Sequence, residues 1–405
     1  MKHRIHDLQY CSELFDAFYG IGSTPSGGVT RLGYTETEDA MHRRFAELAE
    51  GLGCTVSQDA VGNTYACFGT QERGYTLIGS HLDSVVEGGR YDGVAGLIAA
   101  LMLLHWAKED SMELSIKAVA FRCEESSNFG LCTIGSGLIT DENYKPDIGS
   151  LTDRSGQRLD EIFKARGYSL HPEKITGAER YLELHIEQGK VLEELETQVG
   201  IVNTIAGNRR FRLILRGMAE HSGATPMSMR CDAMCAAAEL ILAIEQIGRA
   251  EAVHASVATV GIVKNQPNVM NVIPGEVELG VDIRGIQKDS LDRMEQQIRT
   301  AAQRIAEQRG AEFIEQPISQ AAPVEMSASV QQGLTQAARK LRISSRNMPS
   351  GAGHDAMSFA PVCDTGMVFI PCRQGISHNR MEYAEIEAIC DGARVLYEYL
   401  KGGNV

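Results

Sequence analysis

The stretch YTLIGSHLDSVVEGGRYDGVAGLIAALMLLHWA, residues 75–107, decides the fold class. Its first part, residues 75–80, has the composition of a short strand, and a glycine-rich loop separates it from an apolar run at 94–107 with the length of a helix. Strand-like and helix-like runs keep alternating on both sides of this stretch. Such alternation predicts a sheet that contains parallel strands and is covered by helices.

Most of this alternation belongs to one discontinuous domain. Working outward, strands are expected at residues 114–121, 181–185 and 366–370, and helices at 35–53, 327–341 and 382–399. A Thr35/Glu38 capping box opens the helix at 35–53. We therefore predict an α/β domain, built from residues 1–206 and 320–405, with a mixed, largely parallel sheet and flanking helices.

The segment between these parts, residues 207–319, has an order of its own. Strands are expected at 209–216, 255–263, 277–284 and 312–318, and helices at 231–247 and 291–308. A βαββαβ sequence of this kind folds as a four-stranded sheet with two helices on one face. We expect an inserted α+β domain of ferredoxin-like type.

Composition and charge narrow the classes of partner. The 405 residues are 43% hydrophobic and 23% charged, which is ordinary globular composition, and the formal net charge is −14. This field disfavours nucleic acid and anionic membrane surfaces, so a small anionic substrate would need local cations. The ten cysteines are scattered, and the longest apolar run is too short to span a membrane. We expect a soluble, cytoplasmic protein.

Histidines and acids gather just past predicted strands. The strand at 75–80 is followed by His81, Asp83 and the loop that carries Asp92, and further candidates follow later strands: Glu124, Glu125, His185 and His378. Because sites in open α/β sheets lie at the carboxyl ends of the strands, these side chains are expected to meet. Imidazole and carboxylate together are typical ligands of zinc, manganese or cobalt.

Several motifs resemble those of one enzyme family. They are GGVTRL at 27–32, HLDSVVEGGRYDG at 81–93, EE at 124–125, HIEQG at 185–189, HSGATPM at 221–227, NVMNVIPG at 268–275, GAGHD at 351–355 and ISHN at 376–379. Nearly the whole chain resembles, in order, the hydantoinase/carbamoylase amidases of the dinuclear-metal aminoacylase and carboxypeptidase superfamily. That family includes N-carbamoyl-L-amino-acid hydrolases, β-ureidopropionase and allantoate amidohydrolase.

The resemblance implies a centre with two divalent metal ions, zinc or manganese, with cobalt as a further option. It makes Asp92 the ligand shared by both ions. The other implied ligands are His81, Glu125, His185 and His378. Asp83 is expected to hold the second nitrogen of His81. Glu124 is expected to be the general base, since neighbouring residues at a strand end point to different sides.

The resemblance also assigns residues that bind the substrate. In the family, a histidine at the position of His221 stabilises the developing negative charge and comes from the partner subunit of a homodimer, which makes the inserted segment a lid and dimerisation domain. Arg284 and Asn271 match residues that grip the substrate carboxylate. Further polar contacts are implied for Gln188, His354 and Gly353.

The expected activity is hydrolysis of the ureido C–N bond of an N-carbamoyl-L-amino acid, which gives the free amino acid, ammonia and carbon dioxide. Allantoate is the alternative substrate, because both present a ureido carbonyl near a carboxylate. An aminoacylase or dipeptidase is the third reading, and a metal-binding protein without catalysis is the fourth. The loop at 126–130 differs from that of many relatives, which leaves the exact substrate open.

Overall fold

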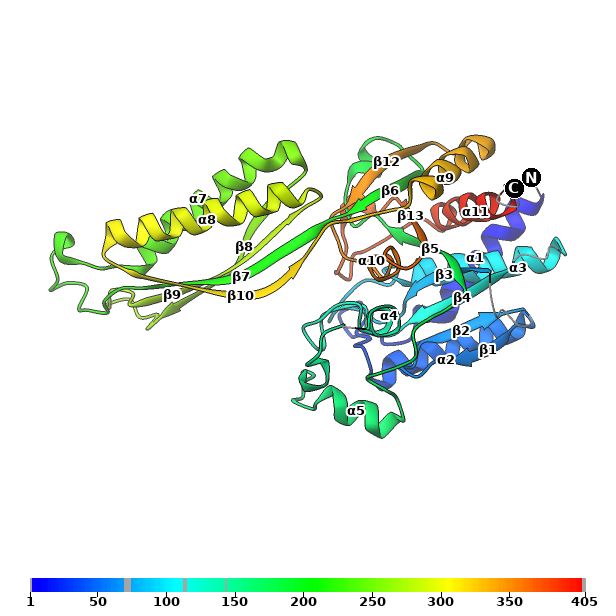
Figure 1. The fold of residues 1–405 in the computed structure, drawn as a ribbon, viewed down its shortest axis with the longest axis horizontal. Coiled ribbons are helices and arrows are strands. Elements are labelled where there is room, and N and C mark those ends of the chain that lie inside the picture. Colours follow the sequence, from blue (N-terminus) through cyan, green and yellow to red (C-terminus); the bar gives the residue numbers. More distant parts are fainter. Residues whose placement is uncertain (1, 69–73, 112–114, 143, 403–405) are drawn as a thin grey trace. The chain divides into compact units, whose positions relative to one another are not determined.

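The computed structural model describes residues 2–68, 74–111, 115–142 and 144–402. It divides into two compact units, Met1–Asn203 with Glu325–Val405, and Thr204–Val324 (Figure 1). The second unit is a few residues longer at each end than the segment 207–319. The first residue of the strand expected at 114–121 lies outside the described residues. Within the described ranges, no helix is both long and apolar enough to cross a membrane.

The first unit is built on a mixed nine-stranded sheet with the order β1-β2-β4-β3-β5-β13-β6-β11, and β12 pairs with β6. The pairs β4–β3, β3–β5 and β5–β13 are parallel, and the pairs β1–β2, β2–β4 and β13–β6 are antiparallel. The strands are β1 (Thr55–Gln58), β2 (Thr64–Cys67), β3 (Tyr75–His81), β4 (Ile116–Phe121), β5 (Ala178–Ile186), β6 (Val199–Ile205), β11 (Val324–Glu325), β12 (Ser345–Ser350) and β13 (Asp364–Ile370). The predicted α/β fold class is confirmed.

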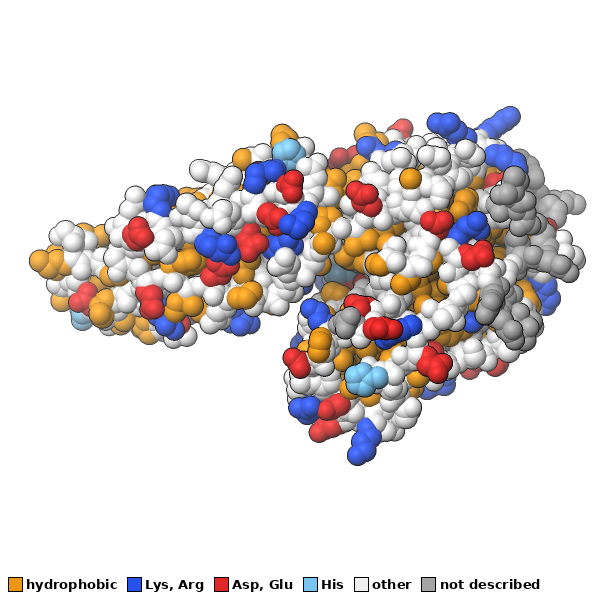
Figure 2. Space-filling model, viewed as in Figure 1, with side chains coloured by type: hydrophobic (Ala, Val, Ile, Leu, Met, Phe, Trp, Pro, Cys, Tyr) orange, Lys and Arg blue, Asp and Glu red, His pale blue; other side chains and the backbone are white. Residues whose placement is uncertain are grey.

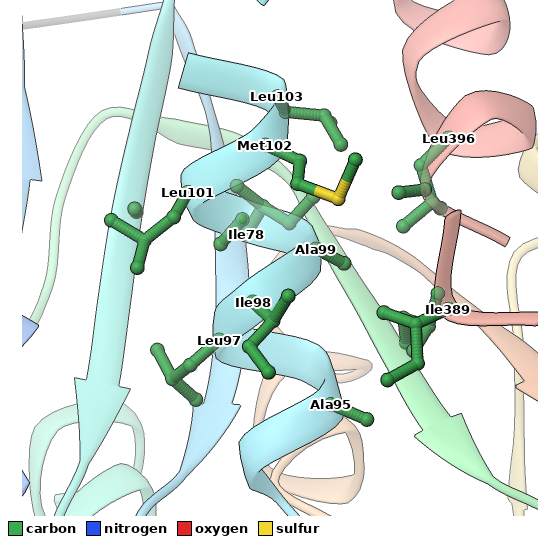
Figure 3. Packing of buried hydrophobic residues seen from close by; sticks show 14 of the residues in the cluster. Ile78, Ala95, Leu97, Ile98, Ala99, Leu101, Met102, Leu103, Ile389 and Leu396 are labelled. Atoms are coloured by element: carbon green, nitrogen blue, oxygen red, sulfur yellow. The ribbon is translucent and has the colours of Figure 1, made fainter. Parts of the chain in front are cut away.

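The helices of this unit are α1 (Lys2–Tyr19), α2 (Glu36–Gly51), α3 (Val94–Glu109), α4 (Ile134–Thr140), α5 (Leu159–Arg166), α6 (Val191–Glu194), α9 (Ala328–Leu341), α10 (Ala356–Phe359) and α11 (Ile386–Gly402). Helix α3 is buried almost all round because it packs against β3, β4 and β5 on one side and α1 and α11 on others. Figure 3 shows its Leu97, Ile98 and Met102 among Ile78, Ile389 and neighbouring apolar side chains.

The pleat of β5 separates this core from the site. Leu182, Leu184 and Ile186 join the core cluster that contains α3, so the alternate residues point to the opposite face. On that face the ring of Tyr181 stacks on Phe359 of α10, with 4.5 Å between centroids. Apolar contacts therefore hold both faces of β5.

The capping box expected at the start of α2 is wrong. The Thr35 side chain makes no capping hydrogen bond and donates instead to the carbonyl of Leu32. Glu38 accepts from the backbone amides of Tyr34 and Cys123, at 2.7 and 2.8 Å. Its carboxylate is thus used for a contact to the end of β4 rather than for closing its own helix.

The second unit is a four-stranded antiparallel sheet with the order β10-β7-β9-β8 and two helices. Its elements are β7 (Gly207–Arg216), α7 (Ala233–Glu251), β8 (Val257–Gln266), β9 (Glu276–Gly285), α8 (Lys288–Arg309) and β10 (Glu312–Ala321). Alternate residues of the sheet, such as Leu213 and Leu279, form a core with α7 and α8. The other face is polar, and Arg212 there lies 3.4 Å from Glu278.

Candidate metal centre and active site

The sheet of the first unit brings most of the predicted site residues to one edge. The strands β4, β3, β5 and β13 are parallel neighbours, so their carboxyl ends meet. His81 is the last residue of β3, His185 lies one residue before the end of β5, and the loops after β4 and β13 lead to Glu124 and His378. Asp92 lies in the loop after β3 and is followed by Gly93. Only glycine fits there, because φ is +66° and a Cβ would lie 2.4 Å from the His81 carbonyl oxygen.

A first group of ligand atoms converges on one oxygen of Asp92. Its Oδ1 lies 3.3 Å from Nε2 of His81 and 3.0 Å from Nε2 of His185. The Nδ1 atoms of these rings lie 3.1 Å from the Asp83 carbonyl and 2.9 Å from the Ile186 carbonyl. Because a ring nitrogen next to a carbonyl oxygen donates, the neutral form of each ring carries its lone pair on Nε2, the nitrogen close to Asp92 Oδ1.

This arrangement fits a cation. Nε2 of His185 is buried and has no hydrogen-bond partner among the described residues, although Asp92 Oδ1 is close to it. Burial opposes charge on these rings, yet the Asp83 and Asp92 carboxylates raise the pKa of His81 well above its usual value, and Asp92 raises the pKa of His185. The site therefore favours positive charge between the rings and the carboxylate, where a divalent ion would take the place of protons.

A second group meets the other oxygen of Asp92. Nε2 of His378 lies 3.2 Å from Asp92 Oδ2 and 3.0 Å from Glu125 Oε1. These contacts raise the pKa of His378 to about 11. In each group the possible ligand atoms lie within 4.8 Å of one another. Asp92 thus faces His81 and His185 with one oxygen and Glu125 and His378 with the other, which is the position of a carboxylate shared by two ions.

A third cluster, Glu183 with His185 and His354, is already occupied by hydrogen bonds. Glu183 accepts from the Ser80 hydroxyl at 2.8 Å and from the Tyr181 hydroxyl at 3.1 Å, and it also accepts from a backbone amide of α10. Nε2 of His354 lies 2.8 Å from the Ser350 hydroxyl. Because the polar atoms of Glu183 and Nε2 of His354 already have partners, this cluster is a poor cation site. It holds neighbouring elements in place next to the other two groups.

Asp83 ties two ligand-bearing segments together. Its two carboxylate oxygens accept from the backbone amides of Glu124 and Glu125, each at 3.0 Å, and one of them lies 3.3 Å from Nδ1 of His81. Cys123, directly before Glu124, has a left-handed φ of +51°. The end of β4 is therefore bent sharply, and the Asp83 and Glu38 carboxylates hold this bend in place.

Glu124 is buried next to the first group. Its Oε2 lies 3.9 Å from Nε2 of His81. Burial raises the pKa of Glu124 well above its usual value, against the lowering effect of His81 and with a further raising effect from Glu125. A buried carboxylate whose pKa is raised in this way holds a proton more readily than an exposed one, which suits a residue that takes up and releases a proton.

Gln188 and His354 lie beside the centre. Nε2 of Gln188 donates to Asp92 Oδ2 at 2.9 Å, and its buried Oε1 has no hydrogen-bond partner among the described residues. The His354 ring packs edge-on against His185, with 4.5 Å between centroids. Gly353, the residue before it, is exposed, and a Cβ there would meet only the Met357 sulfur.

The other three predicted site residues belong to the second unit, and the structure separates them into two places. Ser222 donates its backbone amide to the carbonyl of Asn271 at 3.0 Å, which joins the turns of His221 and Asn271. Both residues are exposed, and so are four methionines near them in sequence: Met218, Met227, Met229 and Met270. Figure 2 shows hydrophobic side chains exposed on the surface of the second unit. Arg284 lies near the other end of β9, where its guanidinium is 3.2 Å from Asp282.

Sequence reasoning missed the buried residues that hold the ligands. Glu382 accepts from the backbone amide of Asp92 and from the Ser377 hydroxyl, which also lies 3.2 Å from Asp92 Oδ2. The signal for Glu183 was its position two residues before His185 on the same strand, which places both side chains on one face. Glu382 had no such local signal, because the two backbone amides that it binds, those of Tyr91 and Asp92, lie about 290 residues away in sequence.

Comparison with known proteins agrees with this geometry. Residues 77–402 match the model of peptidase family M20/M25/M40. The chain is 37% identical over 388 residues to an N-carbamoyl-L-amino acid amidohydrolase of Geobacillus stearothermophilus, covering 93% of this chain and 94% of that protein. It is 32% identical over 399 residues to an allantoate amidohydrolase of Escherichia coli strain K12, covering 96% and 97%.

A solved hydantoinase/carbamoylase family amidase from Burkholderia multivorans has the same fold, with 33% identity, a TM-score of 0.86, and coverage of 98% of this chain and 96% of that one. The family is dependent on dinuclear metal centres, and candidate metal-ligating groups are present in this chain. The family expected from the sequence motifs is confirmed. The chain therefore belongs to the M20/M25/M40 family, among its hydantoinase/carbamoylase amidases, and is an amidohydrolase that acts on C–N bonds.

Proposed function

We propose that this amidohydrolase cleaves the ureido C–N bond of an N-carbamoyl-L-amino acid. The observation that carries the proposal is the double use of Asp92, one oxygen toward His81 and His185 and the other toward Glu125 and His378, with Glu124 buried beside it. The names of relatives at 32–37% identity supply the substrate class. Allantoate is the second candidate, because relatives at 32–33% identity are named for it.

Two divalent ions, zinc or manganese with cobalt as a further option, fit these donors. His81, His185 and Asp92 would hold one ion, and Asp92, Glu125 and His378 the other. When bound, such a pair polarises the ureido carbonyl and makes a water molecule more acidic. Asp83 keeps His81 and the backbone of Glu124 and Glu125 in place for this centre.

Glu124 is the proposed proton carrier. It accepts a proton at a carboxylate oxygen while the oxygen of water bonds to the ureido carbon, and it returns that proton to the terminal nitrogen as the C–N bond breaks. Ammonia leaves, and the remaining carbamate loses carbon dioxide to give the free amino acid. Gln188, His354 and the backbone of Gly353 stand beside the centre and are proposed to make polar contacts to the substrate.

The second unit is proposed to be a lid that supplies His221, Asn271 and Arg284. His221 would donate to the carbonyl oxygen as it becomes negative, and Arg284 with Asn271 would bind the carboxylate. The turns of His221 and Asn271 lie before the first residue of β9, whereas Arg284 lies near its last residue. At 3.3 Å per residue, the strand from Glu276 to Arg284 spans about 26 Å. Because one small substrate cannot reach both ends of β9 in one unit, this separation favours a homodimer in which His221 and Asn271 together act on the partner's site.

The edge of the second sheet offers a surface for such a dimer. Strand β8 pairs only with β9 in the described sheet, and its residues Val257, Ile262 and Val263 are half exposed. An edge strand with exposed apolar residues is a template for pairing with another chain. We therefore propose a homodimer joined through the second unit.

All ten cysteines are thiols, which supports a place in the reducing cytoplasm.

Mixed dimers test the exchange of His221 between subunits. Glu124→Gln and His221→Ala chains, each inactive alone, are coexpressed with different tags and the mixed dimer is purified. If His221 acts across the dimer, the chain with Glu124 intact receives His221 from its partner, and about half of the wild-type activity returns per mixed dimer. A mixed dimer as inactive as its parents would show that His221 acts within its own chain.

The substrate proposal is tested by parallel assays. Apoprotein is reloaded with Mn²⁺ or Zn²⁺ and offered N-carbamoyl-L-amino acids, allantoate and dipeptides, and release of ammonia and free amino acid is followed. We expect metal-dependent release of ammonia from carbamoyl amino acids. Turnover of dipeptides alone would refute the ureido assignment, and faster turnover of allantoate would select the second candidate.

A further inference from the structure

Glu382 is a buried carboxylate placed between two loops of the proposed metal centre. Its Oε1 accepts from the backbone amides of Tyr91 and Asp92, at 2.9 and 3.0 Å. Its Oε2 accepts from the hydroxyl of Ser377 at 2.8 Å. Only 5% of the residue is exposed. One side chain therefore connects the loop of Asp92 to the loop of His378, although these loops are far apart in sequence.

The surrounding chain makes room for this carboxylate. A Cβ on Gly89 would lie 2.1 Å from the Glu382 carboxyl carbon, so only glycine fits at that position of the Asp92 loop. The Ser377 hydroxyl also lies 3.2 Å from Asp92 Oδ2, the oxygen that faces His378. Glu382 thus touches the backbone of Asp92 directly and its carboxylate through Ser377.

Asp83 is a second buried carboxylate of the same kind, because it also binds two successive backbone amides near the proposed metal centre. Asp83 accepts from two successive backbone amides, those of Glu124 and Glu125, and touches His81. Glu382 likewise accepts from two successive amides, those of Tyr91 and Asp92. Glu382 is in none of the candidate metal-ligating groups of the described residues. Two buried carboxylates therefore fix four ligand-bearing segments without being ligands themselves.

We propose that Glu382 is the positioning residue of the shared ligand, setting the place of Asp92 and of the His378 loop relative to each other. This role rests on the proposed metal centre. Hydrogen bonds from backbone amides to a buried carboxylate are strong, and removing the acceptor leaves two donors without partners. Since Asp92 faces both candidate groups, its displacement weakens both ion sites together. Partners of this kind contribute about 10–100-fold to metal affinity.

The test measures metal affinity rather than turnover. Apoproteins of the wild type, Glu382→Ala, Glu382→Gln and the control Glu385→Gln are titrated with Mn²⁺ against a chelator of known affinity, and circular dichroism checks their folding. Glu385 is three residues away and pairs on the surface with Arg373 at 3.2 Å. We expect Mn²⁺ affinity to fall about 10–100-fold in Glu382→Ala, less in Glu382→Gln, whose carbonyl still accepts from both amides, and less than twofold in the control.

A second variant covers the case in which Glu382→Ala does not fold. Gly89→Ala leaves Glu382 in the chain but pushes its carboxylate away, and it should lower Mn²⁺ affinity in the same way. A folded Glu382→Ala or Gly89→Ala with wild-type affinity, changed only in melting temperature, would overturn the positioning role. Wild-type protein that takes up no Mn²⁺ or Zn²⁺ would instead overturn the metal centre, and this role with it.

Discussion

The proposed site residues in the two units differ in how the protein holds them. In the first unit, His81, Asp92 and His185 are at most 4% exposed, and each is fixed by hydrogen bonds to neighbouring loops or strands. In the second unit, His221 and Asn271 are exposed in turns. Buried polar groups need partners inside the protein. These three residues of the first unit are therefore held in place by the folded chain itself, whereas His221 and Asn271 lie open to solvent on the second unit.

The largest expected effect tests the first unit. Glu124→Gln should lower turnover at least about a hundredfold, and up to about 10⁴-fold, because the amide cannot accept the proton. Metal content, measured by elemental analysis, should stay at the wild-type level, because Glu124 lies outside the candidate metal-ligating groups among the described residues. Retained turnover would remove Glu124 from the mechanism. Loss of metal would make it a ligand.

A somewhat smaller effect is expected in the second unit. His221→Ala should lower kcat about a hundredfold, the usual cost of losing one donor to a developing oxyanion. The matched control is His254→Ala, in the short 3₁₀ turn Ala252–His254 that follows α7 in the same unit, which should leave kcat unchanged. An unaltered rate in His221→Ala would mean that the exposed turn has no part in catalysis, and the contrast between the units would then lose its functional meaning.

Substrate binding should show a still smaller effect. Arg284→Lys should raise KM about tenfold with little change in kcat, because a lysine ammonium cannot make the paired contacts of a guanidinium to a carboxylate. Steady-state kinetics on a carbamoyl amino acid measures this. Arg212→Lys, on the same polar face of the sheet and paired with Glu278, is the control and should leave KM as it is. Equal effects of both substitutions would contradict a specific contact between Arg284 and the substrate carboxylate.

The smallest effect concerns the stability of the second unit. Hydrogen bonds from Arg293 and Ser290 lower the pKa of Glu251 to about 2. Glu251→Gln should cost about 1 kcal/mol at pH 7, seen as roughly fivefold faster hydrogen exchange in α7 and α8. Because the folded pKa lies below the usual 4.5, this contribution is complete above pH 4.5 and disappears as the pH falls toward 2.

The difference between wild type and Glu251→Gln should therefore shrink on acidification. The control is Glu245→Gln, whose partner Arg249 is largely exposed, and it should change exchange very little. A gap that widens at low pH would contradict the assignment of this stability to the charged form of Glu251.

Sequence patterns were informative wherever the physical cause is local. The strand at 75–80, the buried helix that follows it and the position of the candidate metal ligands just past strand ends all depend on neighbouring residues. The prediction of a capping box was wrong because the Glu38 carboxylate accepts a hydrogen bond from the amide of Cys123. The two residues are 85 positions apart, so no local pattern contains this contact. The helix expected from residue 382 begins at Ile386, and Glu382 instead turns toward the amide of Asp92. Hydrogen bonds between distant loops were invisible in the sequence.

The first and last strands of the second unit, β7 and β10, pair with each other, which makes this unit easy to insert or remove as a segment of the chain. Asn208 of β7 lies opposite Ala321 of β10, so the chain enters and leaves this unit side by side. The strands that precede and follow it, β6 and β11, are also neighbours in the larger sheet. A gene could therefore gain or lose the whole segment between these two adjacent crossing points without changing the order of the remaining strands. Such a junction allows the segment to be removed or transplanted as one piece.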